Sequence, residues 1–415
     1  MRKITSLILC AVLFFTSAGC VSDSEQTERE STVRETLNYA ENLKGVWFSY
    51  YEIGKIFASL SKEEAEQKAE EIFADLAGKG INTVFFHVRA FADAFYPSKL
   101  FPRSEYAPKS FDLLKLIIEA AHAQQISLHA WINPYRVAND KELSDLPDTS
   151  PAVELYKKSR QNLFFHKGGI YMNPARKGVQ KLILGGIREL VESYDIDGIH
   201  FDDYFYPSSS KELDKKSYAA YKSGGGTLSR EDYRRENVSA LIRAAHALIK
   251  EHNESILFGV SPQCSLEKNE EELFADLTRW VEDEAVDYLM PQIYFGFENE
   301  ASPFQKSVDE WRERMQGKSA ALYCGLALYK SGKEDAYASE NHKSETSPYY
   351  EWVHHTDIIA RQIQYLKEKG VRGYTIYSYT SLVNSENNAN LQEEIDNLLP
   401  VLNARQLLLW KIDKK

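Results

Sequence analysis

Short apolar runs alternate with amphipathic segments along most of the chain. Runs of this length, with apolar residues at consecutive positions, are typical of strands that are buried on both faces of a parallel sheet. Eight strands are predicted, at residues 45–51, 82–89, 127–134, 197–204, 256–262, 287–295, 321–329 and 373–379.

The segments between these runs have helical spacing and recognisable ends. Ser61 and Glu64 have the spacing of a capping box, and helically spaced apolar positions continue from there until Gly78. The other helices are predicted to begin at Ser110 and Arg176 and to cover residues 229–252, 270–284, 304–316, 355–369 and 391–403. Eight strands, each followed by a helix, predict an α/β fold of the (β/α)8 or TIM barrel type. The alternative, an open doubly wound sheet, usually carries a glycine-rich phosphate loop after its first strand, and this chain has none there.

The chain begins with a secretory signal. A basic start at residues 1–3 precedes an apolar stretch, residues 4–15, that is too short to cross a bilayer as a helix. The small residues that follow end in Cys20, and this run resembles a bacterial lipobox. The resemblance implies cleavage before Cys20 and lipidation of its thiol and new amino group. The alternatives are an ordinary signal peptide with a chance cysteine, or a short membrane anchor.

These signals divide the chain into four parts. Residues 1–19 are predicted to be a lipoprotein signal peptide, 20–42 a lipidated tether, 43–404 the barrel and 405–415 a C-terminal tail. The predicted location is therefore the bacterial cell envelope, outside the cytoplasm, with the membrane contacted through the lipid anchor only.

Composition narrows the possible partners. With 43% hydrophobic and 27% charged residues the chain is globular, and its net charge of −11 argues against a nucleic-acid partner, which requires a basic surface. Cys264 and Cys324 are expected to be unpaired thiols in the body of the protein. No cluster of cysteine and histidine in the sequence has the spacing of zinc ligands, so neither a metal nor another cofactor is predicted.

Barrel enzymes build their sites from residues at the carboxyl ends of the strands. The fourth predicted strand runs into the stretch DGIHFDDYFYP, where the neighbouring carboxylates Asp202 and Asp203 precede Tyr204. Amide, aromatic and basic groups end the other strands, and the predicted substrate-binding residues are Arg89, Trp131, Asn133, Arg136, Tyr204, Gln263, Gln292, Tyr294, Tyr329, Lys330 and Tyr379. Amides pair with hydroxyl groups and aromatic rings cover apolar C–H faces, so this set suits a carbohydrate.

Several motifs along the predicted barrel resemble those of one known family. The chain is similar to the glycosyl-hydrolase-10-like lipoprotein family in the stretches GVWFSY, FFHVRAFADAFYPS, AWINPYRV, YMNPARKGVQ, DIDGIHFDDYFYP, DYRRENV, FGVSPQ, DYLMPQIYF and GLALYK. The resemblance implies a bacterial envelope glycosidase with a glycan as its partner, because members characterised as enzymes cut peptidoglycan strands that have lost their stem peptides.

Two kinds of glycosidase chemistry could use the paired aspartates. In the conventional kind, Asp202 would be a nucleophile, and a second carboxylate would act as the acid across the scissile bond of some other polysaccharide. Amylase-like barrels place that second group, a glutamate, at the end of strand five, where this chain has Gln263; the remaining candidates are Glu52, Asp93 and Glu298. The missing glutamate also leaves open a barrel that binds glycan without cleaving it.

The second kind of chemistry is substrate-assisted. The 2-acetamido oxygen of an N-acetylhexosamine attacks its own anomeric carbon, so the protein supplies one carboxylate that holds the acetamide N–H and one acid that protonates the leaving oxygen. We expect Asp202 to orient the acetamide and Asp203 to be the acid. Both reach a pocket only if the strand breaks there, because neighbours on a regular strand face opposite ways. The long segment 206–228 is expected to be a mobile flap over the same rim.

Overall fold

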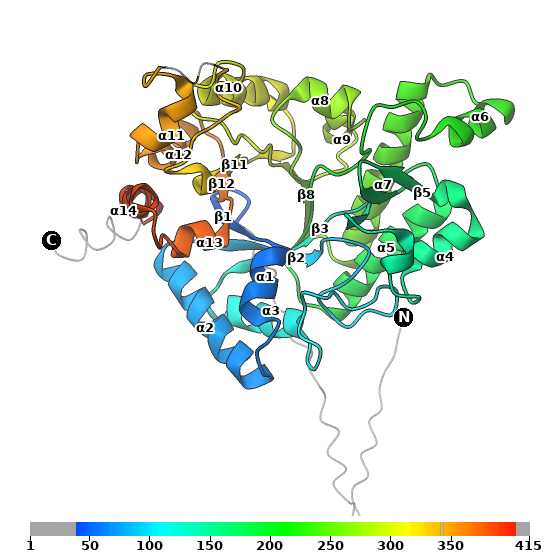
Figure 1. The fold of residues 1–415 in the computed structure, drawn as a ribbon, viewed down its shortest axis with the longest axis horizontal. Helices are drawn as coiled ribbons and strands as arrows, with labels where there is room; N and C mark the ends of the chain where they lie inside the picture. Colours follow the sequence, from blue (N-terminus) through cyan, green and yellow to red (C-terminus); the bar gives the residue numbers. More distant parts are fainter. Residues whose placement is uncertain (1–38, 341, 343, 404–415) are drawn as a thin grey trace, which may run out of the picture. The chain divides into compact units, whose positions relative to one another are not determined.

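The computed structural model describes residues 39–340, 342 and 344–403. Its main sheet is parallel, with strands in the order β10-β9-β8-β7-β3-β2-β1-β12-β11 (Figure 1). The strands are β1 (Leu43–Phe48), β2 (Thr83–Arg89), β3 (Ser127–Ile132), β7 (Gly198–Phe201), β8 (Leu257–Val260), β9 (Tyr288–Leu289), β10 (Ala321–Leu322), β11 (Cys324–Leu326) and β12 (Gly373–Ile376). The predicted signal peptide, the predicted lipidation site Cys20, most of the predicted tether and the predicted C-terminal tail lie outside the described residues.

One interrupted strand closes the sheet. β10 pairs with β9 and β11 pairs with β12, and only Tyr323 separates β10 from β11. The Tyr323 N–H donates to the carbonyl of Leu289 at 2.9 Å, which continues the hydrogen-bond ladder through the gap. The sheet is therefore a closed barrel with eight strand positions, and the predicted (β/α)8 fold is confirmed.

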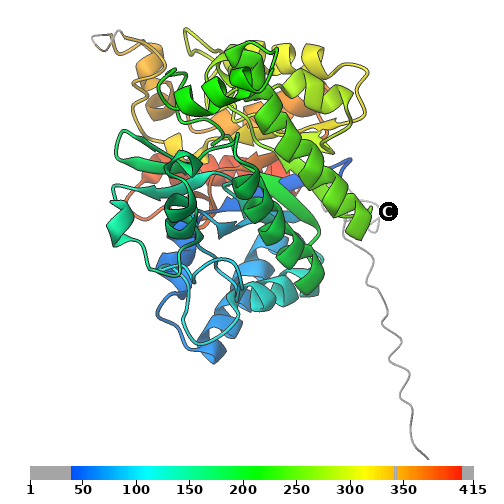
Figure 2. The same ribbon diagram turned by 90° about the vertical axis from the view of Figure 1, so that its right-hand side faces the viewer.

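Helices connect the strands and lie on the outside of the barrel (Figures 1 and 2). Their ends follow local sequence signals: the Ser61 hydroxyl accepts the backbone N–H of Glu64 at 3.2 Å at the start of α2, as the capping box predicts. The helices are α1 (Tyr50–Phe57), α2 (Lys62–Gly78), α3 (Leu113–Ala123), α4 (Pro151–Lys158), α5 (Lys177–Ser193), α6 (Lys215–Ser223), α7 (Arg230–His252), α8 (Leu266–Glu271), α9 (Leu277–Glu282), α10 (Phe304–Met315), α11 (Glu351–His354), α12 (Ile358–Glu368), α13 (Tyr379–Val383) and α14 (Ala389–Leu402).

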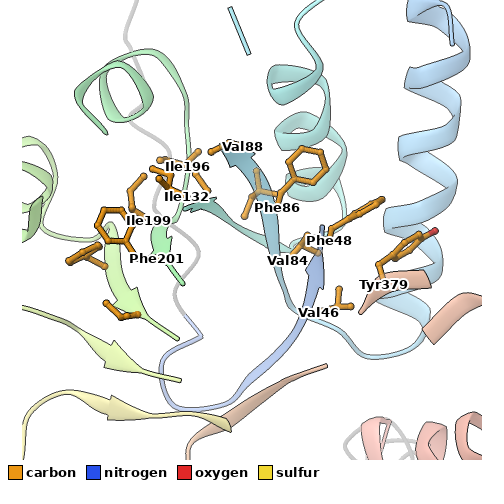
Figure 3. Packing of buried hydrophobic residues seen from close by; sticks show 14 of the residues in the cluster. Val46, Phe48, Val84, Phe86, Val88, Ile132, Ile196, Ile199, Phe201 and Tyr379 are labelled. Atoms are coloured by element: carbon orange, nitrogen blue, oxygen red, sulfur yellow. The ribbon is translucent and has the colours of Figure 1, made fainter. Parts of the chain in front are cut away.

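The strand side chains alternate between two apolar layers, because successive residues of a strand point to opposite faces. Val46 and Phe48 of β1 and Phe86 of β2 belong to the outer layer, which packs beneath the helices (Figure 3). Trp47 and Phe85 belong to a separate cluster that fills the interior of the barrel. Each strand is therefore apolar on both faces, which is why the strands read as continuous apolar runs in the sequence.

Two elements differ from the prediction for local reasons. β1 stops at Phe48, before its predicted end, because Glu52 accepts both the backbone N–H and the hydroxyl of Ser49 at 2.8 Å and α1 begins there. The predicted helix at 270–284 is two shorter helices, α8 and α9, because Phe274 between them has a positive φ of 57°, which no helix residue adopts.

A small antiparallel sheet that was not predicted is inserted between β3 and α5. Its strands, in the order β4-β6-β5, are β4 (Arg136–Asn139), β5 (Leu163–His166) and β6 (Gly169–Met172). The strands are too short to give a clear alternation in the sequence. The sheet begins at Arg136, so it brings that side chain to the rim of the barrel.

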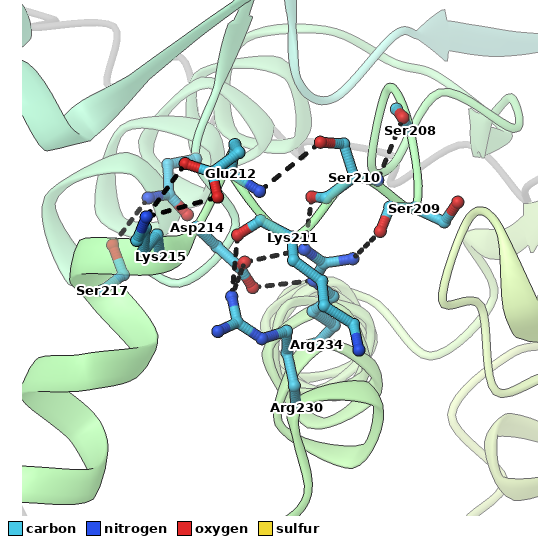
Figure 4. Close-up of polar contacts among 11 residues, drawn as sticks. Ser208, Ser209, Ser210, Lys211, Glu212, Asp214, Lys215, Ser217, Arg230 and Arg234 are labelled. Atoms are coloured by element: carbon cyan, nitrogen blue, oxygen red, sulfur yellow. Dashed lines mark hydrogen bonds and ion pairs between the residues drawn. The ribbon is translucent and has the colours of Figure 1, made fainter.

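The segment 206–228, which was expected to be a mobile flap, is anchored to α7 by a buried ion pair. Arg234 of α7 donates to both carboxylate oxygens of Asp214, each at 2.7 Å, and neither side chain is exposed by more than 1% (Figure 4). The same guanidinium donates to the carbonyls of Ser209 at 3.0 Å and Ser210 at 2.7 Å. The segment also contains α6, so it has regular structure and a fixed attachment.

The described residues contain no helix that is both long and apolar enough to cross a membrane. Cys264 and Cys324 are unpaired, as predicted, and burial raises the pKa of each thiol. Within the same part of the chain, no group of three or more histidine, cysteine or acidic side chains is arranged to hold a metal ion.

Candidate active site

A cavity of 380 Å³ lies at the carboxyl ends of the barrel strands, where barrel enzymes place their sites. Carboxylate, amide, imidazole, guanidinium and aromatic groups converge on it from strands that are far apart in the sequence. It is lined by Trp47, Ser49, Tyr50, His87, Trp131, Arg136, Asp202, Asp203, Tyr204, Ser261, Gln292, Tyr294 and Tyr377.

The chain breaks from strand geometry at the paired aspartates. β7 ends at Phe201, and both Asp202 and Asp203 line the cavity. The aromatic residues that follow have different places: Tyr204 is 43% exposed at the rim, whereas Phe205 and Tyr206 are buried. The Phe205 ring packs 5.4 Å from Trp280 and the Tyr206 ring 5.3 Å from Phe274, measured between ring centroids. The buried rings therefore hold the backbone in place directly after the acidic pair.

Asp202 is the more deeply buried member of the pair, with 3% of its surface exposed. The indole N–H of Trp131 donates to its Oδ2 at 3.1 Å, and the backbone N–H of Tyr204 to its Oδ1 at 3.5 Å. Burial, and then the neighbouring charge of Asp203, raise the pKa of Asp202 to about 7, against the opposing effect of Arg136. Near neutral pH this carboxyl group can therefore hold a proton.

Asp203 is partly exposed and is held by side-chain amides. Gln292 Nε2 donates to Asp203 Oδ1 at 3.2 Å and to the carbonyl of Ser261 at 3.0 Å. Gln263 also donates a hydrogen bond to this carboxylate. Burial raises the pKa of Asp203, while the two glutamine amides oppose the rise because they stabilise the charged form. The glutamine at the end of the fifth barrel strand therefore serves the aspartate pair instead of supplying a second acid.

His87 offers the cavity an uncommitted hydrogen-bond donor. Its ring stacks on the indole of Trp131, with centroids 3.8 Å apart and planes 10° from parallel. Burial, followed by the charge of Arg136, lowers the pKa of His87 well below its usual range, so the ring is neutral. Its Nδ1 accepts the backbone N–H of Tyr50 at 3.4 Å, which leaves the proton on Nε2. That Nε2 is buried and has no hydrogen-bond partner among the described residues.

Below the cavity, a layer of hydrogen-bonded side chains closes the barrel. His200 Nε2 accepts the indole N–H of Trp47 at 3.3 Å and lies 3.0 Å from Ser261 Oγ, and its Nδ1 lies 3.0 Å from the Tyr288 hydroxyl. His129 Nδ1 is 3.1 Å from the same hydroxyl. These groups satisfy one another, so the floor of the site is rigid.

Arg136 lies between two rings at the rim. Its guanidinium carbon is 4.7 Å from the centroid of Phe91 and 4.5 Å from that of Tyr204, and its Nε donates to the carbonyl of Ala90 at 3.2 Å. The side chain is thus fixed by stacking and by a backbone contact. Its positive charge opposes the rise in pKa that burial causes in Asp202 and Asp203.

Of the residues predicted from the sequence, seven line the cavity: Trp131, Arg136, Asp202, Asp203, Tyr204, Gln292 and Tyr294. The lining does not include Arg89. A β-bulge shifts the register of β2 against β3 between His87 and Arg89, and the guanidinium lies over the ring of Phe101, 3.9 Å from its centroid. Bulges re-aim side chains in this way, so Arg89 leaves the alternation that puts His87 in the cavity.

The other predicted residues outside the lining have structural partners. Lys330 forms a 2.7 Å ion pair with Asp335, and the Tyr379 ring stacks on Phe48 at 4.3 Å. Asn133 accepts the backbone N–H of Arg136, and Gln263 contacts Asp203 from beside the cavity. Tyr329 contacts the rings of two lining residues, Tyr294 and Tyr377, edge-on.

The lining also contains residues outside the predicted catalytic and substrate-binding set. Tyr50, His87, Ser261 and Tyr377 lie at predicted strand ends but were not included in that set, and Trp47 and Ser49 were not considered. The alternation along β1 was the available signal for Trp47 and Ser49, but placing the end of the strand too late obscured it. Glu52, one of the candidate acids, is occupied elsewhere: besides Ser49 it binds the Ser378 hydroxyl at 2.5 Å and the Thr380 N–H at 2.7 Å.

A model of the glycosyl hydrolase-like 10 family matches residues 42–342. This chain belongs to that family. The matched region includes every residue that lines the cavity except Tyr377. The resemblance seen in the sequence motifs is thereby confirmed, and the chain is classed with the glycoside hydrolases.

Two curated relatives are named as glycosyl hydrolases. Glycosyl hydrolase YngK from Bacillus subtilis (strain 168) is 30% identical over 295 residues, which are 65% of this chain and 57% of the relative. Glycosyl hydrolase DigH from Escherichia coli (strain K12) is 29% identical over 366 residues, which are 79% of this chain and 82% of the relative. The present chain thus covers little more than half the length of YngK.

Two solved structures illustrate the likeness of fold. The glycoside hydrolase domain of PgaB (BpsB) from Bordetella bronchiseptica has a TM-score of 0.56 at 12% identity, over 86% of this chain and 98% of that one. The catalytic domain of the β-amylase from Paenibacillus polymyxa has a TM-score of 0.55 at 12% identity, over 87% and 98%. At 12% identity these likenesses show the fold of this protein, and they do not show its substrate or its catalytic residues.

Proposed function

We propose that this protein cleaves N-acetylated glycan of the bacterial cell envelope, peptidoglycan strands in particular, by substrate-assisted catalysis. One observation carries the proposal: in the described part of the chain, Asp202 and Asp203 are the only carboxylates that line the cavity. They are adjacent in sequence, so they do not face each other across a bond from separate strands as a conventional pair does. An acetamido group of the substrate supplies the nucleophile that the protein lacks.

The alternative acids lie elsewhere. The carboxylate of Glu52 is buried. It accepts hydrogen bonds from Ser49 at the start of α1 and from Ser378 and Thr380 at the start of α13. Asp93 lines a neighbouring cavity, and Glu298 is exposed and outside the lining. None of them is placed to act with Asp202 on one glycosidic bond, which argues against a nucleophilic role for Asp202 on another polysaccharide.

The electrostatics favour a division of labour within the pair. Asp202, whose pKa is raised to about 7, holds the proton and donates it to the leaving glycosidic oxygen. Asp203, whose charged form is stabilised by Gln292 and Gln263, accepts the acetamide N–H while the acetamide oxygen attacks the anomeric carbon. Water then opens the cyclic intermediate and returns a proton to Asp202. This assignment reverses the roles expected from the sequence.

The remaining cavity groups suit substrate binding. The Nε2–H of His87 is a donor without a partner, and the rings of Tyr204, Tyr294 and Tyr377 present flat apolar surfaces. The names of YngK and DigH, both glycosyl hydrolases, support a hydrolase rather than a non-catalytic glycan-binding barrel. We also propose anchoring in the cell envelope through lipidated Cys20, on the strength of the N-terminal sequence.

Digestion of defined glycan tests the proposal. Purified peptidoglycan treated with an amidase, to remove stem peptides, is expected to yield shortened strands that mass spectrometry resolves, and de-N-acetylated strands of the same length are expected to resist. The variant with both Asp202→Asn and Asp203→Asn serves as the inactive control. Efficient cleavage of the de-N-acetylated strands would rule out substrate assistance, and binding of both strands without cleavage would identify a non-catalytic barrel.

A further inference from the structure

A second cavity, of 660 Å³, adjoins the candidate active site. One of its walls is the segment 91–109, between β2 and α3, and the other is the segment 137–150, at and after the end of β4. Tyr50 belongs to the linings of both cavities. Arg136 of the active-site cavity lies over the ring of Phe91, which lines the second cavity. We call this second cavity the distal cleft.

The distal cleft has aromatic rings on one side and apolar side chains on the other. The ring of Tyr50 meets Phe91 and Tyr106 edge-on, with centroids 5.3 Å and 5.2 Å away. All three rings are half-buried, so part of each remains accessible. Buried Val137 and Ala138 of β4 add apolar surface to the opposite wall. Rings in this setting cover the apolar C–H surface of a sugar, and the row begins at the edge of the active-site cavity.

The distal cleft also contains polar groups that can form hydrogen bonds with the hydroxyl groups of a sugar. Asp93 lines it, with Oδ1 accepting the backbone N–H of Phe91 at 3.2 Å, and Ser104 donating to the same carboxylate. A carboxylate has about four acceptor positions, so Asp93 retains capacity for the hydroxyls of a ligand. At the exposed edge, Lys141 and Glu105 form a 2.6 Å ion pair that links the two walls.

The lining of the distal cleft carries charged side chains of both signs. The charged residues that line the cleft are Asp93, Glu105, Asp140 and Asp145 on the acidic side, and Arg103, Lys109 and Lys141 on the basic side. A glycan strand that has lost its stem peptides keeps a lactyl carboxylate on each muramyl unit, and the basic side chains of the lining can accept these carboxylates. The rings and the remaining acceptors suit the C–H faces and hydroxyl groups of the same strand.

We propose that the distal cleft binds sugar units next to the cleaved bond, so that the protein prefers long glycan chains to a disaccharide. The inference rests on the proposed function, because the occupant is the same glycan that enters the active-site cavity. It adds an extended binding surface across segments 91–109 and 137–150, which carry none of the residues assigned to the chemistry.

The test compares a hexasaccharide with a disaccharide, both prepared from amidase-treated peptidoglycan. The quantity measured is the ratio of kcat/KM on the hexasaccharide to kcat/KM on the disaccharide. The wild-type ratio is expected to be about ten or more, which corresponds to about 1.4 kcal/mol of additional binding. Tyr106→Ala removes a ring from the wall, and Asn139→Trp places an indole in the cleft from an exposed position of β4. Both are expected to lower the ratio by about tenfold.

Tyr337→Ala is the matched control, because Tyr337 is an 81% exposed aromatic residue outside both cavities. Its ratio should equal that of the wild type. A wild-type ratio near one, or an unchanged ratio in folded Tyr106→Ala and Asn139→Trp, overturns the inference. Thermal unfolding checks the fold, and Asn139→Trp decides alone if Tyr106→Ala does not fold.

Failure of the proposed function is a separate outcome. If the wild type cleaves neither oligosaccharide, the proposed function fails, and calorimetry with the hexasaccharide then tests the distal cleft directly. Weaker hexasaccharide binding by Asn139→Trp than by the wild type supports the cleft as a glycan site. Equal affinities, or no binding by the wild type, overturn it.

Discussion

The indole of Trp131 connects two strands at the candidate active site by donating its N–H to Asp202 Oδ2 at 3.1 Å. Trp131 stands at the end of β3, and its ring is held from one side by the stacked imidazole of His87 on β2. The position of the Asp202 carboxylate therefore depends on a rigid pair of rings from neighbouring strands. The hydrogen bond also stabilises the ionised carboxylate, so it limits the rise in the pKa of Asp202 that burial causes.

Trp131→Phe is expected to remove the hydrogen bond while keeping a ring against His87. Without the donor the pKa of Asp202 rises further, so the fall of kcat/KM at high pH shifts to higher pH. The lost orientation should lower kcat by about ten- to a hundredfold. The pH profile of kcat/KM measures the shift, and kcat at saturating substrate measures the loss. Trp311→Phe is the control, because the Trp311 indole bonds the Cys264 carbonyl at 2.8 Å, outside the cavity lining. An unshifted profile in Trp131→Phe would contradict this coupling.

Kinetics on two leaving groups should separate the aspartates. Asp202→Asn is expected to damage cleavage of natural glycan by about 10²–10⁴-fold, the usual contribution of a general acid, and to affect activated aryl glycosides much less. Asp203→Asn is expected to impair both substrates, because orientation of the acetamide precedes the loss of either leaving group. The opposite pattern would exchange the two roles. Near-normal activity in both variants would remove the pair from the mechanism.

The raised pKa of Asp202 makes a prediction about stability. Its folded-state pKa of about 7 lies above the ordinary value of 3.8, so burial of this group costs nothing below pH 3.8 and destabilises the fold as the pH rises toward 7. Asp202→Asn removes that cost. At pH 8 the free energy of unfolding of the variant is expected to exceed that of the wild type by up to about 4 kcal/mol, so the variant unfolds at a higher temperature. Near pH 3 the two proteins are expected to be equally stable.

Thermal or urea unfolding across this pH range measures the difference. Asp148→Asn, at an exposed aspartate, provides the control and should show no such trend. A constant difference between Asp202→Asn and the wild type at all pH values would mean that Asp202 titrates alike in the folded and unfolded states.

The parts of the protein that were predictable from sequence follow strong local patterns. The barrel strands are apolar on both faces, and Ser61 with Glu64 marks the start of α2, so both were found correctly. The aspartate pair was found because it interrupts an apolar run. The departures are harder to read from a local pattern. Glu52, whose bonds to Ser49 end β1, is also held by Ser378 and Thr380, which lie after β12 and far away in the sequence.

Side-chain direction was the hardest feature to predict. Arg89 has the spacing of a cavity residue, yet the bulge after His87 turns it away, and no residue of β2 announces a bulge. The small sheet that carries Arg136 is built from strands of four residues, which are too short for a periodic signal. The distal cleft depends on how that sheet faces the segment after β2, a relation between parts that no single stretch encodes.

The buried ion pair between Asp214 and Arg234 should contribute far more to the free energy of unfolding than an ion pair on the surface does (Figure 4). Arg234→Met removes the bidentate partner of Asp214 but leaves the Arg230 guanidinium, whose Nη1 donates to Asp214 Oδ1 at 2.8 Å. The variant is therefore expected to lower the free energy of unfolding by about 3 kcal/mol, the low end of the range for a broken buried pair. Arg188→Met breaks the exposed pair with Glu192, where the side chains are 55% and 52% exposed, and should cost less than about 1 kcal/mol. Urea titration measures both, and similar losses in the two variants would contradict the role assigned to Arg234.

The envelope location rests on Cys20, which lies outside the described residues, and it has its own test. Cys20→Ala removes the thiol that would carry lipid, so the variant is expected to leave the membrane fraction and appear in the soluble fraction after expression in a bacterial host. Cys264→Ala is the matched control, because Cys264 is an unpaired thiol of the barrel, and this variant should remain with the membranes. Metabolic labelling with a fatty-acid analogue should mark the wild type and Cys264→Ala but not Cys20→Ala. Membrane retention of an unlabelled Cys20→Ala protein would show that the apolar stretch at residues 4–15 anchors the chain uncleaved.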